Sequence, residues 1–549
     1  MPTITLDRKE FEKLVGKRLP DDKLKDRISM LGTDLEEVNS KEILVEVFPD
    51  RPDMLSEQGF ARAFSSFIVH KTGLRKYKVR KSGEKVIVDA SVKEVRPFTA
   101  CAIVKNLKLD DNRIKQLMQL QEKLHITFGR NRKKAAIGIY PLERIKMPIT
   151  FKAMKPEDVK FKPLEYPKEL NGLEVLQLHP KGKEFGKLLS GCKQFPFFVD
   201  AAGKILSMPP IINSDDVGKV ETSTREVFIE CSGFDFNTLK QCLHIIVAAL
   251  ADMGGDVYSM EILDGKNKEV TPHLEPAKLK MDLGYVNKIL GLHLKESEMK
   301  KLLERMGFGY QNKHALIPAY RADVLHPVDV VEDVAIAYGY EHFQEEIPKI
   351  STIASEDAGI KMREKIAALL TGFGLLEISS YHLTNATEHR NASLQQEIIE
   401  LANALNQDYH ALRASLIPSL LKVFSENKHH EYPQKIFEIA TCFEKGDSET
   451  GIVEKKKLCV GVTSANAGFT DVKQILDSVM MLMGMKYTLA EEEAASFIPG
   501  RCGKILVDGK TIGHLGEVHP QVLANFSLDY PVAMIEIDVD WLVKGLEGK

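Results

Sequence analysis

With 549 residues, 44% of them hydrophobic and 28% charged, the chain is predicted to form a globular protein of about three to five domains. Its formal net charge of −3 excludes an overall basic field, although local patches could still meet nucleic acid. The seven cysteines are scattered and form no C-x-x-C pair, which counts against a disulfide framework and a structural zinc site. No run approaches about 18 apolar residues and the N-terminus has no apolar stretch, so neither a membrane span nor a secretory signal is expected. These features favour a cytoplasmic location.

Residues 1–80 are expected to form an N-terminal α/β domain. Residues 3–6 alternate as a short strand, and a helix follows over 8–15. The sequence ILVEVF (43–48) predicts a further strand, which breaks at the prolines of PDRPD (49–53). Spacing alone favours a turn braced by pairs of Arg and Asp at PDRPD over a functional role.

The next stretch predicts a helix, a connector and a larger unit. Ser56 precedes a helix with phenylalanines at helical spacing, and Gly73 is expected to end it. Residues 76–87 are basic and contain a glycine, which indicates a connector. Residues 88–265 then have the mixed strand and helix patterns of one larger unit.

Three stretches of this unit could line a ligand site. Four basic residues within 130–134 could form a solvated turn or meet phosphates, and composition favours neither. The paired prolines within 205–216 interrupt an apolar stretch, and rigid turns of this kind often line pockets. Residues 226–233 alternate as a strand with Glu230 near its end, where a carboxylate could act as a general base or anchor a ligand. Pairing of Glu230 with a neighbouring Arg or Lys is the simpler alternative.

Residues 270–347 are predicted to form a compact, winged-helix-like module. Two short helices, 283–290 and 296–306, each end at a glycine and accompany a pair of strands. Because the second helix mixes Glu with Lys, we interpret the module as a packing unit and not as a DNA-binding one.

The segment 317–340 within this module holds four carboxylates in eleven positions of an otherwise apolar stretch. Its prolines predict a short strand, a turn and a helix from about Val328. Three of the carboxylates then stand at i, i+3 and i+4 on one helical face, where like charges repel. The pattern indicates a counter-charge, either a divalent cation or basic groups of a partner. An acidic helix N-terminus that favours the macrodipole is the alternative. The four residues are Asp323, Asp329, Glu332 and Asp333.

Residues 350–549 are expected to combine strands and helices in a further unit. Helices are predicted at 359–373 and within 410–430, and strands follow the second helix. Residues 496–520 predict two antiparallel strands joined at an Asp-Gly turn, and a last strand begins at Pro531.

Four stretches together resemble the beta subunit of phenylalanine–tRNA ligase in order, spacing and length. They are PDRPDMLSEQGFAR (49–62), the 281–345 module, LRASLIPSLL (412–421) with FEIATCFE, and PGRCGKILVDGKTIGHLGEVHP. The resemblance covers nearly the whole chain, is most specific at 281–345, and is to the shorter form of archaea and the eukaryotic cytosol. The tRNA-binding OB domain and the C-terminal anticodon-binding domain of the bacterial form have no counterpart here.

The resemblance implies a subunit of an α2β2 class II synthetase, which charges tRNA-Phe with phenylalanine using ATP and Mg²⁺. It implies that Asp323, Asp329, Glu332 and Asp333 form a magnesium site shared with the alpha subunit. Residues 413–418 match the family's dimer-forming signature, whereas no match to its second and third, ATP-binding signatures is found. Synthesis is therefore expected in the alpha subunit.

The resemblance also implies an editing domain at 88–265, which hydrolyses mischarged tyrosyl-tRNA-Phe. An apolar pocket rejects one added hydroxyl only modestly, so a second sieve is useful. By motif position Glu230 would recognise or orient the tyrosine end. The pocket would be lined by Ser207, Pro210 and Asn213.

One departure from the family pattern bears on editing. Tyr140 and Pro141 stand where the family usually carries a His-Asp pair, so no catalytic role is assigned there. A purely structural, RNA-associated scaffold with a decayed editing pocket is the alternative function, and the two differ at Glu230. The near-neutral pI of about 6.6 and the lack of a basic recognition helix count against a stand-alone nucleic-acid-binding regulator built on 278–345.

The expected fold class is therefore α+β and multidomain. Its predicted parts are an N-terminal α/β interaction domain (1–80), a mixed editing domain (88–265), a winged-helix-like module (270–347) and a class II synthetase-like antiparallel sheet with helices (350–549). The partners implied are the alpha subunit and tRNA-Phe, without a membrane.

Overall fold

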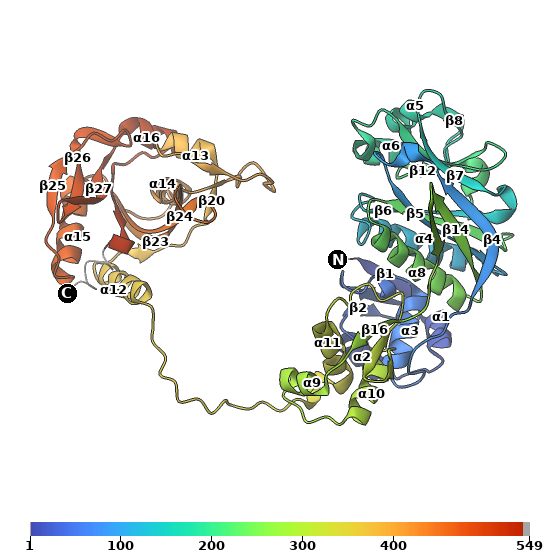
Figure 1. Cartoon of the computed structure of the whole chain (residues 1–549). Helices are drawn as coiled ribbons and strands as arrows, with labels where there is room; N and C mark the ends of the chain where they lie inside the picture. Colours follow the sequence, from blue (N-terminus) through green and yellow to red (C-terminus); the bar gives the residue numbers. More distant parts are fainter. Residues whose placement is uncertain (1, 542–549) are drawn as a thin grey trace. The chain divides into compact units, whose positions relative to one another are not determined.

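The computed structural model describes residues 2–541 (Figure 1). They form two compact units, and the boundary between the units along the chain lies between Glu346 and Ile347. Each unit contains helices and more than one sheet, so the predicted mixed α+β, multidomain class is confirmed. All seven cysteines are free thiols. Across residues 2–541 no helix combines the length and the apolar character that crossing a membrane would require.

The first unit begins with a three-stranded antiparallel sheet in the order β1-β3-β2, covered by three helices. Ser56 caps the third helix by accepting a hydrogen bond from the Gly59 N–H at 3.0 Å. The predicted end at Gly73 is wrong, because the helix stops at Phe67 and Val69 already has the left-handed φ of 59°. The elements are β1 (Thr3–Asp7), α1 (Arg8–Val15), α2 (Asp21–Met30), β2 (Asp34–Val38), β3 (Glu42–Glu46) and α3 (Glu57–Phe67).

The turn at PDRPD is braced as the sequence predicts. The guanidinium of Arg51 donates to both carboxylate oxygens of Asp53, at 2.9 and 3.0 Å, and both side chains are buried. A charged pair of this kind is stable in the interior because each ion satisfies the other's hydrogen bonds.

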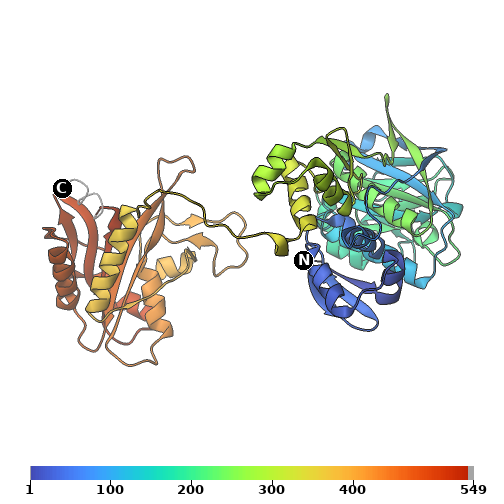
Figure 2. The ribbon, with the colours of Figure 1, turned by 90° about the horizontal axis from the view of Figure 1, so that it is seen from below.

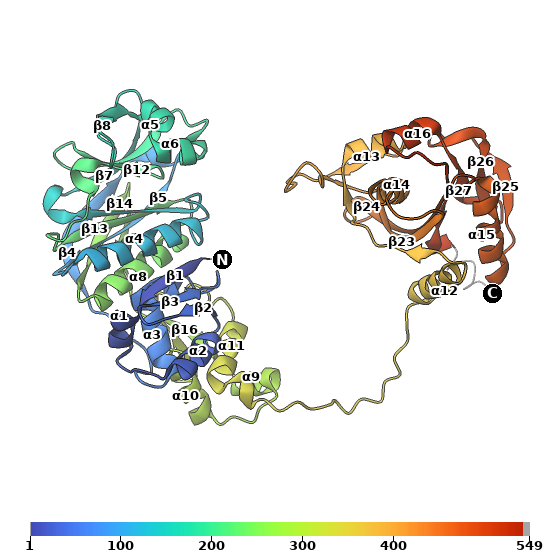
Figure 3. The same ribbon diagram turned by 180° about the vertical axis from the view of Figure 1, so that it is seen from behind.

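A ten-stranded sheet follows, in the order β12-β11-β10-β7-β4-β14-β5-β13-β6, with β15 paired to β14. Figure 3 shows α4 and α8 side by side on one face of this sheet. The elements are β4 (Val79–Val88), β5 (Phe98–Lys105), α4 (Asp111–Ile126), β6 (Ala135–Pro141), β7 (Ile149–Met154), β10 (Phe195–Val199), β11 (Ile205–Met208), β12 (Ile212–Asn213), β13 (Val227–Gly233), α8 (Phe236–Asp252), β14 (Asp256–Asp264) and β15 (Asn267–Thr271). Smaller elements are β8 (Lys160–Phe161), β9 (Leu170–Asn171), α5 (Gly172–Leu178), α6 (Pro180–Phe185) and α7 (Asp215–Gly218).

The connector predicted at 76–87 is wrong, because β4 runs through most of it. The strand lies inside the sheet and pairs in parallel with β14 and β7. Its basic residues are exposed, namely Arg80, Lys81 and Lys85. Only Val86 and Val88 are fully buried. The sequence pattern therefore does not indicate this strand, because its exposed residues are basic and its stability comes from backbone pairing with the neighbouring strands.

The winged-helix-like module has the two short helices that the sequence predicts, together with a three-stranded sheet. Gly291 ends the first helix with a left-handed φ of 66°, a conformation that glycine adopts without strain. One hydrophobic core joins this module to the N-terminal sheet and to α8. The elements are β16 (Ala277–Lys280), α9 (Leu283–Leu290), α10 (Glu296–Arg305), β17 (Gly309–Gln311), β18 (His314–Ile317) and α11 (Pro327–Tyr338).

The second unit is built on a seven-stranded sheet in the order β19-β23-β24-β28-β27-β26-β25. Its strand pairs are antiparallel except for β19 with β23. Figure 2 shows α12 and α15 against the sheet, and their apolar residues share one core with it. The helix predicted within 410–430 is shorter, because residues 411–412 form a strand before it begins. The helices are α12 (Ala358–Gly372), α13 (Ala386–Asn391), α14 (Ile417–Glu426), α15 (Phe469–Leu482) and α16 (Pro520–Asn525). The strands are β19 (Leu376–Glu377), β20 (Leu383–Thr384), β21 (Ile399–Glu400), β22 (Ala411–Leu412), β23 (Gln434–Lys445), β24 (Ile452–Thr463), β25 (Thr488–Glu491), β26 (Phe497–Val507), β27 (Lys510–Val518) and β28 (Val532–Asp538).

Candidate functional site

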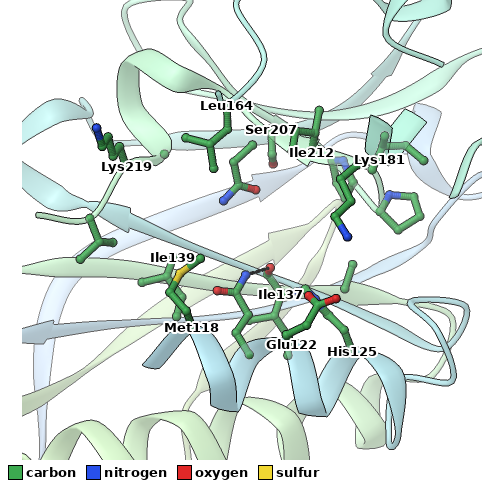
Figure 4. A pocket seen from close by; sticks show the side chains of 18 of the residues that line it. Met118, Glu122, His125, Ile137, Ile139, Leu164, Lys181, Ser207, Ile212 and Lys219 are labelled. Carbon is green, nitrogen blue, oxygen red and sulfur yellow. Dashed lines mark hydrogen bonds and ion pairs between the residues drawn. The ribbon is translucent and has the colours of Figure 1, made fainter. Parts of the chain in front are cut away.

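A cavity of about 690 Å³ opens at the β6 edge of the ten-stranded sheet, between α4 and the β11–β12 hairpin. Figure 4 shows Met118, Glu122 and His125 of α4 facing Ser207 and Ile212 across this space. Its volume is in the range of small-ligand sites in proteins.

The structure brings together all four residues that the sequence predicts for a pocket. Glu230, Ser207, Pro210 and Asn213 each line this cavity. Glu230 lies in the middle of β13 and not near its end, because the strand continues through Gly233 with the register intact on both sides. The prolines stand at the tip of the β11–β12 hairpin, where they interrupt the pairing.

Glu230 is buried and its hydrogen-bond partner is a neutral hydroxyl. Tyr140 donates from its hydroxyl, which lies 3.1 Å from Glu230 Oε1 and 3.4 Å from Asn213 Oδ1. Within the described residues no Lys or Arg forms an ion pair with Glu230, so the simpler alternative of a salt bridge does not apply.

Four polar atoms of the residues that line the cavity are buried and lack a hydrogen-bond partner within the described part of the chain. Two belong to the predicted pocket residues Glu230 and Ser207, and the others are His125 Nδ1 and Arg132 Nε. Neither Glu230 Oε2 nor Ser207 Oγ has a hydrogen-bond partner among residues 2–541. The Ser207 hydroxyl also faces that of Tyr140, although no hydrogen bond of normal geometry joins them. A buried polar atom left unpaired costs about 1–3 kcal/mol, so both atoms can gain from a ligand that supplies a partner.

The electrostatics favour the neutral form of Glu230 at low and neutral pH. Burial raises the pKa of Glu230 to about 8, while the Tyr140 hydroxyl, the charge of Arg96 and the Ser232 hydroxyl each lower it. Arg96 itself donates to the Ser232 side chain at 3.1 Å, and Cys101 of β5 faces Glu230 from the neighbouring strand. A carboxyl with a raised pKa in a cavity is a candidate functional group.

The basic stretch 130–134 divides into one buried and several exposed residues. Arg132 is buried, donates to the Ile211 carbonyl at 2.8 Å, and pairs with Glu122 at 3.3 Å. It thereby fastens the β11–β12 hairpin to α4, while Arg130, Lys133 and Lys134 remain exposed. Figure 4 also shows Lys181 and Lys219 at opposite sides of the cavity.

Three of the four carboxylates predicted as a metal site are held in two different ways. Arg321 donates to both oxygens of Asp323, at 2.8 and 2.6 Å, and to Asp333 at 2.6 Å. Asp329 accepts from the backbone N–H groups of Leu325 and His326, as expected at an acidic helix N-terminus.

Glu332 differs from the other three carboxylates. It is exposed, and its pKa is raised first by partial burial and then by the neighbouring carboxylates. Burial would raise the pKa of Asp323, but Arg321 holds it below its usual value. Between residues 2 and 541, no group of three or more His, Cys, Asp or Glu side chains is arranged to hold a metal ion.

The sequence does not predict the side chains that bond to these carboxyls, which are Tyr140 at Glu230 and Arg321 at Asp323 and Asp333. In the sequence Tyr140 stands out only as a departure from a motif, and no role is predicted for Arg321. A signal for Arg321 exists, because Arg51-Pro-Asp53 and Arg321-Ala-Asp323 share the Arg-x-Asp spacing and both form bidentate pairs.

Comparison with known proteins gives full-length matches. The phenylalanine–tRNA ligase beta subunit of Pyrococcus abyssi is 40% identical over 550 residues, which cover 98% of this chain and 99% of that protein. The same subunit of Thermococcus sibiricus is 38% identical over 558 residues, covering 99% and 100%. The chain belongs to the family of archaeal-type phenylalanine–tRNA ligase beta subunits.

Further matches agree with this family. The "tRNA synthetase B5 domain" model matches residues 279–340, and the "Phenylalanyl tRNA synthetase beta chain CLM domain" model matches 344–539. A crystal structure of an N-terminal fragment of the phenylalanyl-tRNA synthetase beta subunit from Pyrococcus horikoshii is 37% identical, covers 61% of this chain and 99% of the fragment, and has a TM-score of 0.59. The resemblance inferred from the sequence is confirmed, and the chain is a subunit of an aminoacyl-tRNA ligase.

Proposed function

We propose that this beta subunit supports the charging of tRNA-Phe with phenylalanine and hydrolyses mischarged tyrosyl-tRNA-Phe in the cavity that Glu230 lines. Family membership supports the first role, and the chemistry of the cavity wall supports the second. In this proposal the chain acts in the cytoplasm within an α2β2 heterotetramer, where ATP is a substrate of the complex and the alpha subunit synthesises the aminoacyl-tRNA.

The proposed domain layout follows the boundaries expected from the sequence. Residues 1–80 form an interaction domain, 88–265 the editing domain, 270–347 the B5-like module and 350–549 a class II-like core without ATP-binding signatures. The sheet of the editing domain also includes β4, which begins before position 88, and β15, which lies after position 265. The B5 match at 279–340 and the antiparallel sheet of the second unit support the last two assignments.

The editing proposal depends mainly on two of the unpartnered atoms of the cavity wall, Glu230 Oε2 and Ser207 Oγ. Tyrosine differs from phenylalanine by one hydroxyl. A tyrosyl group would give these atoms a partner, whereas a phenylalanyl group would leave them unpaired. A site built to hydrogen-bond a hydroxyl discriminates strongly against the analogue that lacks it.

The remaining cavity residues have complementary roles in this proposal. Apolar side chains such as Ile137 and Pro210 would pack against the aromatic ring, and Lys181 and Lys219 would attract the phosphates of the tRNA 3′ end. Hydrolysis then consists of water adding to the ester carbonyl carbon, cleavage of the bond to the ribose oxygen, and return of a proton to that oxygen.

The test uses the assembled complex with Glu230→Ala and Glu230→Gln. We expect hydrolysis of tyrosyl-tRNA-Phe to fall about 10- to 100-fold, the effect of losing a hydrogen bond to a buried carboxyl, while charging stays unchanged. Glu226→Gln, at a partly exposed position just before the same strand, is the matched control. Unchanged hydrolysis in Glu230→Ala would remove Glu230 from the proposed function.

A structural scaffold with a decayed editing pocket is the second candidate. The observation in its favour is that the Tyr140 hydroxyl already holds one oxygen of Glu230. A wild-type complex that charges tRNA-Phe but leaves tyrosyl-tRNA-Phe intact would establish this alternative.

We further propose that Asp329 and Glu332 of this chain coordinate Mg²⁺, with other ligands from the alpha subunit. Carboxylate oxygens suit Mg²⁺, and these two side chains form no ion pair within the described part of the chain. Asp323 and Asp333 fit less well, because both already pair with Arg321. The ion would neutralise the acidic surface where two subunits meet.

The magnesium proposal predicts a dependence of assembly on these two residues. Asp329→Asn combined with Glu332→Gln should weaken the association of the subunits and remove its dependence on Mg²⁺, as measured by native mass spectrometry with and without a chelator. Equal assembly of the double variant and the wild type under both conditions would contradict it.

A further inference from the structure

The hydroxyl of Tyr140 reaches Glu230 because a glycine leaves room for it. Gly138 and Tyr140 are two positions apart on β6, so they occupy the same face of the strand, and Gly138 is the direct partner of Glu230 across the sheet. A Cβ atom at position 138 would lie 2.6 Å from Glu230 Oε1 and closer still to the Tyr140 oxygen. Only glycine therefore allows the tyrosine ring to lie back along the strand and the two polar groups to meet.

The ring of Tyr140 is fixed by its surroundings. It is fully buried and stacks on Phe228, with ring centroids 5.8 Å apart and an interplanar angle of 28°. Phe228 lies two positions before Glu230 on β13, so one strand holds both the ring and the acceptor of the hydroxyl. Because a phenol has one proton to donate, the closer Glu230 Oε1 at 3.1 Å is its acceptor, and Asn213 stands beyond at 3.4 Å.

We propose that Tyr140 is the specificity-determining positioning residue of this pocket, which holds Oε1 of Glu230 so that Oε2 alone meets the hydroxyl of a tyrosyl group. The inference rests on the proposed editing function. It assigns a purpose to the residue that departs from the family's His-Asp pattern, and it requires the pair Gly138 and Tyr140 together.

The geometry explains why fixing one oxygen matters. A carboxyl group without a partner can rotate, and the orientation of its free oxygen is then an entropy cost at the moment of binding. Tyr140 removes that freedom in advance, and among the four predicted pocket residues the unpartnered Glu230 Oε2 and Ser207 Oγ are left for a ligand. A phenylalanyl group gains nothing from this arrangement, because it has no hydroxyl.

The main test is Tyr140→Phe in the assembled complex, which removes the hydroxyl and keeps the ring on Phe228. We expect kcat/KM for hydrolysis of tyrosyl-tRNA-Phe to fall about tenfold, with charging and residual hydrolysis of phenylalanyl-tRNA-Phe unchanged. The pH profile is a second readout. The Tyr140 hydroxyl lowers the pKa of Glu230, so its removal should raise that pKa. A change in rate that follows the ionisation of Glu230 should then occur at a higher pH. The other groups near Glu230, which are Arg96, Ser232 and Cys101, are the same in both proteins.

A double variant separates positioning from a direct role. Because Tyr140 acts through Glu230, Tyr140→Phe combined with Glu230→Gln should hydrolyse tyrosyl-tRNA-Phe no more slowly than Glu230→Gln alone. Gly138→Ala, which crowds both that hydroxyl and Glu230 Oε1, should also lower the hydrolysis of tyrosyl-tRNA-Phe and leave that of phenylalanyl-tRNA-Phe unchanged. It keeps the inference testable if the phenylalanine variant does not fold.

Three outcomes overturn the inference while the editing function stands. These are wild-type rates and pH profile in Tyr140→Phe, equal losses on both aminoacyl-tRNAs, or additive losses in the double variant. A wild-type complex without tyrosyl-tRNA-Phe hydrolysis contradicts the editing function itself, and the inference falls with it.

Discussion

Asp333 on α11 and Glu230 on β13 are both buried carboxyl groups, yet the structure treats them in opposite ways. Asp333 lies 2.6 Å from the guanidinium of Arg321, which it shares with Asp323, so each of these carboxyls has a positive charge beside it. Glu230 meets a neutral hydroxyl at 3.1 Å, and its other oxygen has no partner among the described residues. In the first arrangement both carboxyls are paired within the chain, although Arg321 Nη1 has no partner between residues 2 and 541, whereas in the second the carboxyl itself keeps an unpartnered oxygen.

The comparison shows that a shifted pKa does not by itself distinguish the two roles. Burial is the largest cause of the raised pKa of both carboxyls, and the pKa of Asp333 is raised even beside Arg321. The partner of the carboxyl is the better guide. A guanidinium indicates a structural pair, and an unpartnered oxygen facing a cavity indicates a binding site.

The largest expected effect comes from removing the guanidinium. Arg321→Met leaves the carboxyls of Asp323 and Asp333 without their counter-charge, and loss of one partner from a buried ion pair costs about 3–5 kcal/mol. We expect the urea midpoint of the first unit to fall accordingly. Arg144→Met is the control, because the Arg144–Glu221 pair is partly exposed and such pairs contribute at most about 1 kcal/mol. Equal losses in the two variants would show that Arg321 is not a buried brace.

Neutralising each carboxyl in turn should give effects of different sign. Asp333→Asn weakens the bond to Arg321 and is expected to destabilise the unit by about 1–3 kcal/mol. Glu230→Gln removes a group whose ionised form is costly to bury, so the stability at pH 8 should stay the same or rise. Urea unfolding of both variants measures the difference, and a destabilisation of similar size in both would remove the distinction between the two carboxyls.

The sequence predicts the local parts of this comparison. The helix α9 and the start of α11 follow from apolar spacing, caps and prolines, which act within a few residues. The pocket residues Ser207 and Glu230 follow from motif position, and the structure brings them to one cavity although 23 positions separate them.

The partners of the two carboxyls could not be predicted in the same way. Tyr140 meets Glu230 across 90 positions, through the register of β6 with β13, and no local pattern encodes that register. The same limit explains the missed strand β4, whose place in the sheet depends on β14 and β7 and not on its own basic residues. Arg321 was within reach, because its Arg-x-Asp spacing repeats that of PDRPD.

The pH dependence of stability tests the same difference between the two carboxyls. The pKa of Glu230 is raised by folding from about 4.5 to about 8, so its contribution is fully present below about pH 4.5 and is lost as the pH rises through 8. The slope is at most about 1.4 kcal/mol per pH unit. Between pH 5 and 8 the wild type should therefore lose more stability than Glu230→Gln. Glu57, whose pKa burial also raises to about 8, makes Glu57→Gln a second variant with a flatter profile. Parallel profiles of wild type and Glu230→Gln would mean that Glu230 ionises normally.

The smallest effect should come from the exposed cations of the cavity, which help to collect the ligand but do not select it. Lys181→Ala with Lys219→Ala is expected to raise KM for tyrosyl-tRNA-Phe about two- to fivefold, without changing kcat or the preference for tyrosyl over phenylalanyl groups. Screening should abolish the difference from wild type at about 1 M salt, where the Debye length is about 3 Å. Lys187→Ala, an exposed lysine outside the cavity lining, is the matched control. If the double lysine variant lost selectivity as Glu230→Gln does, recognition would lie in surface charge, and the buried oxygen of Glu230 would not be what distinguishes the two aminoacyl groups.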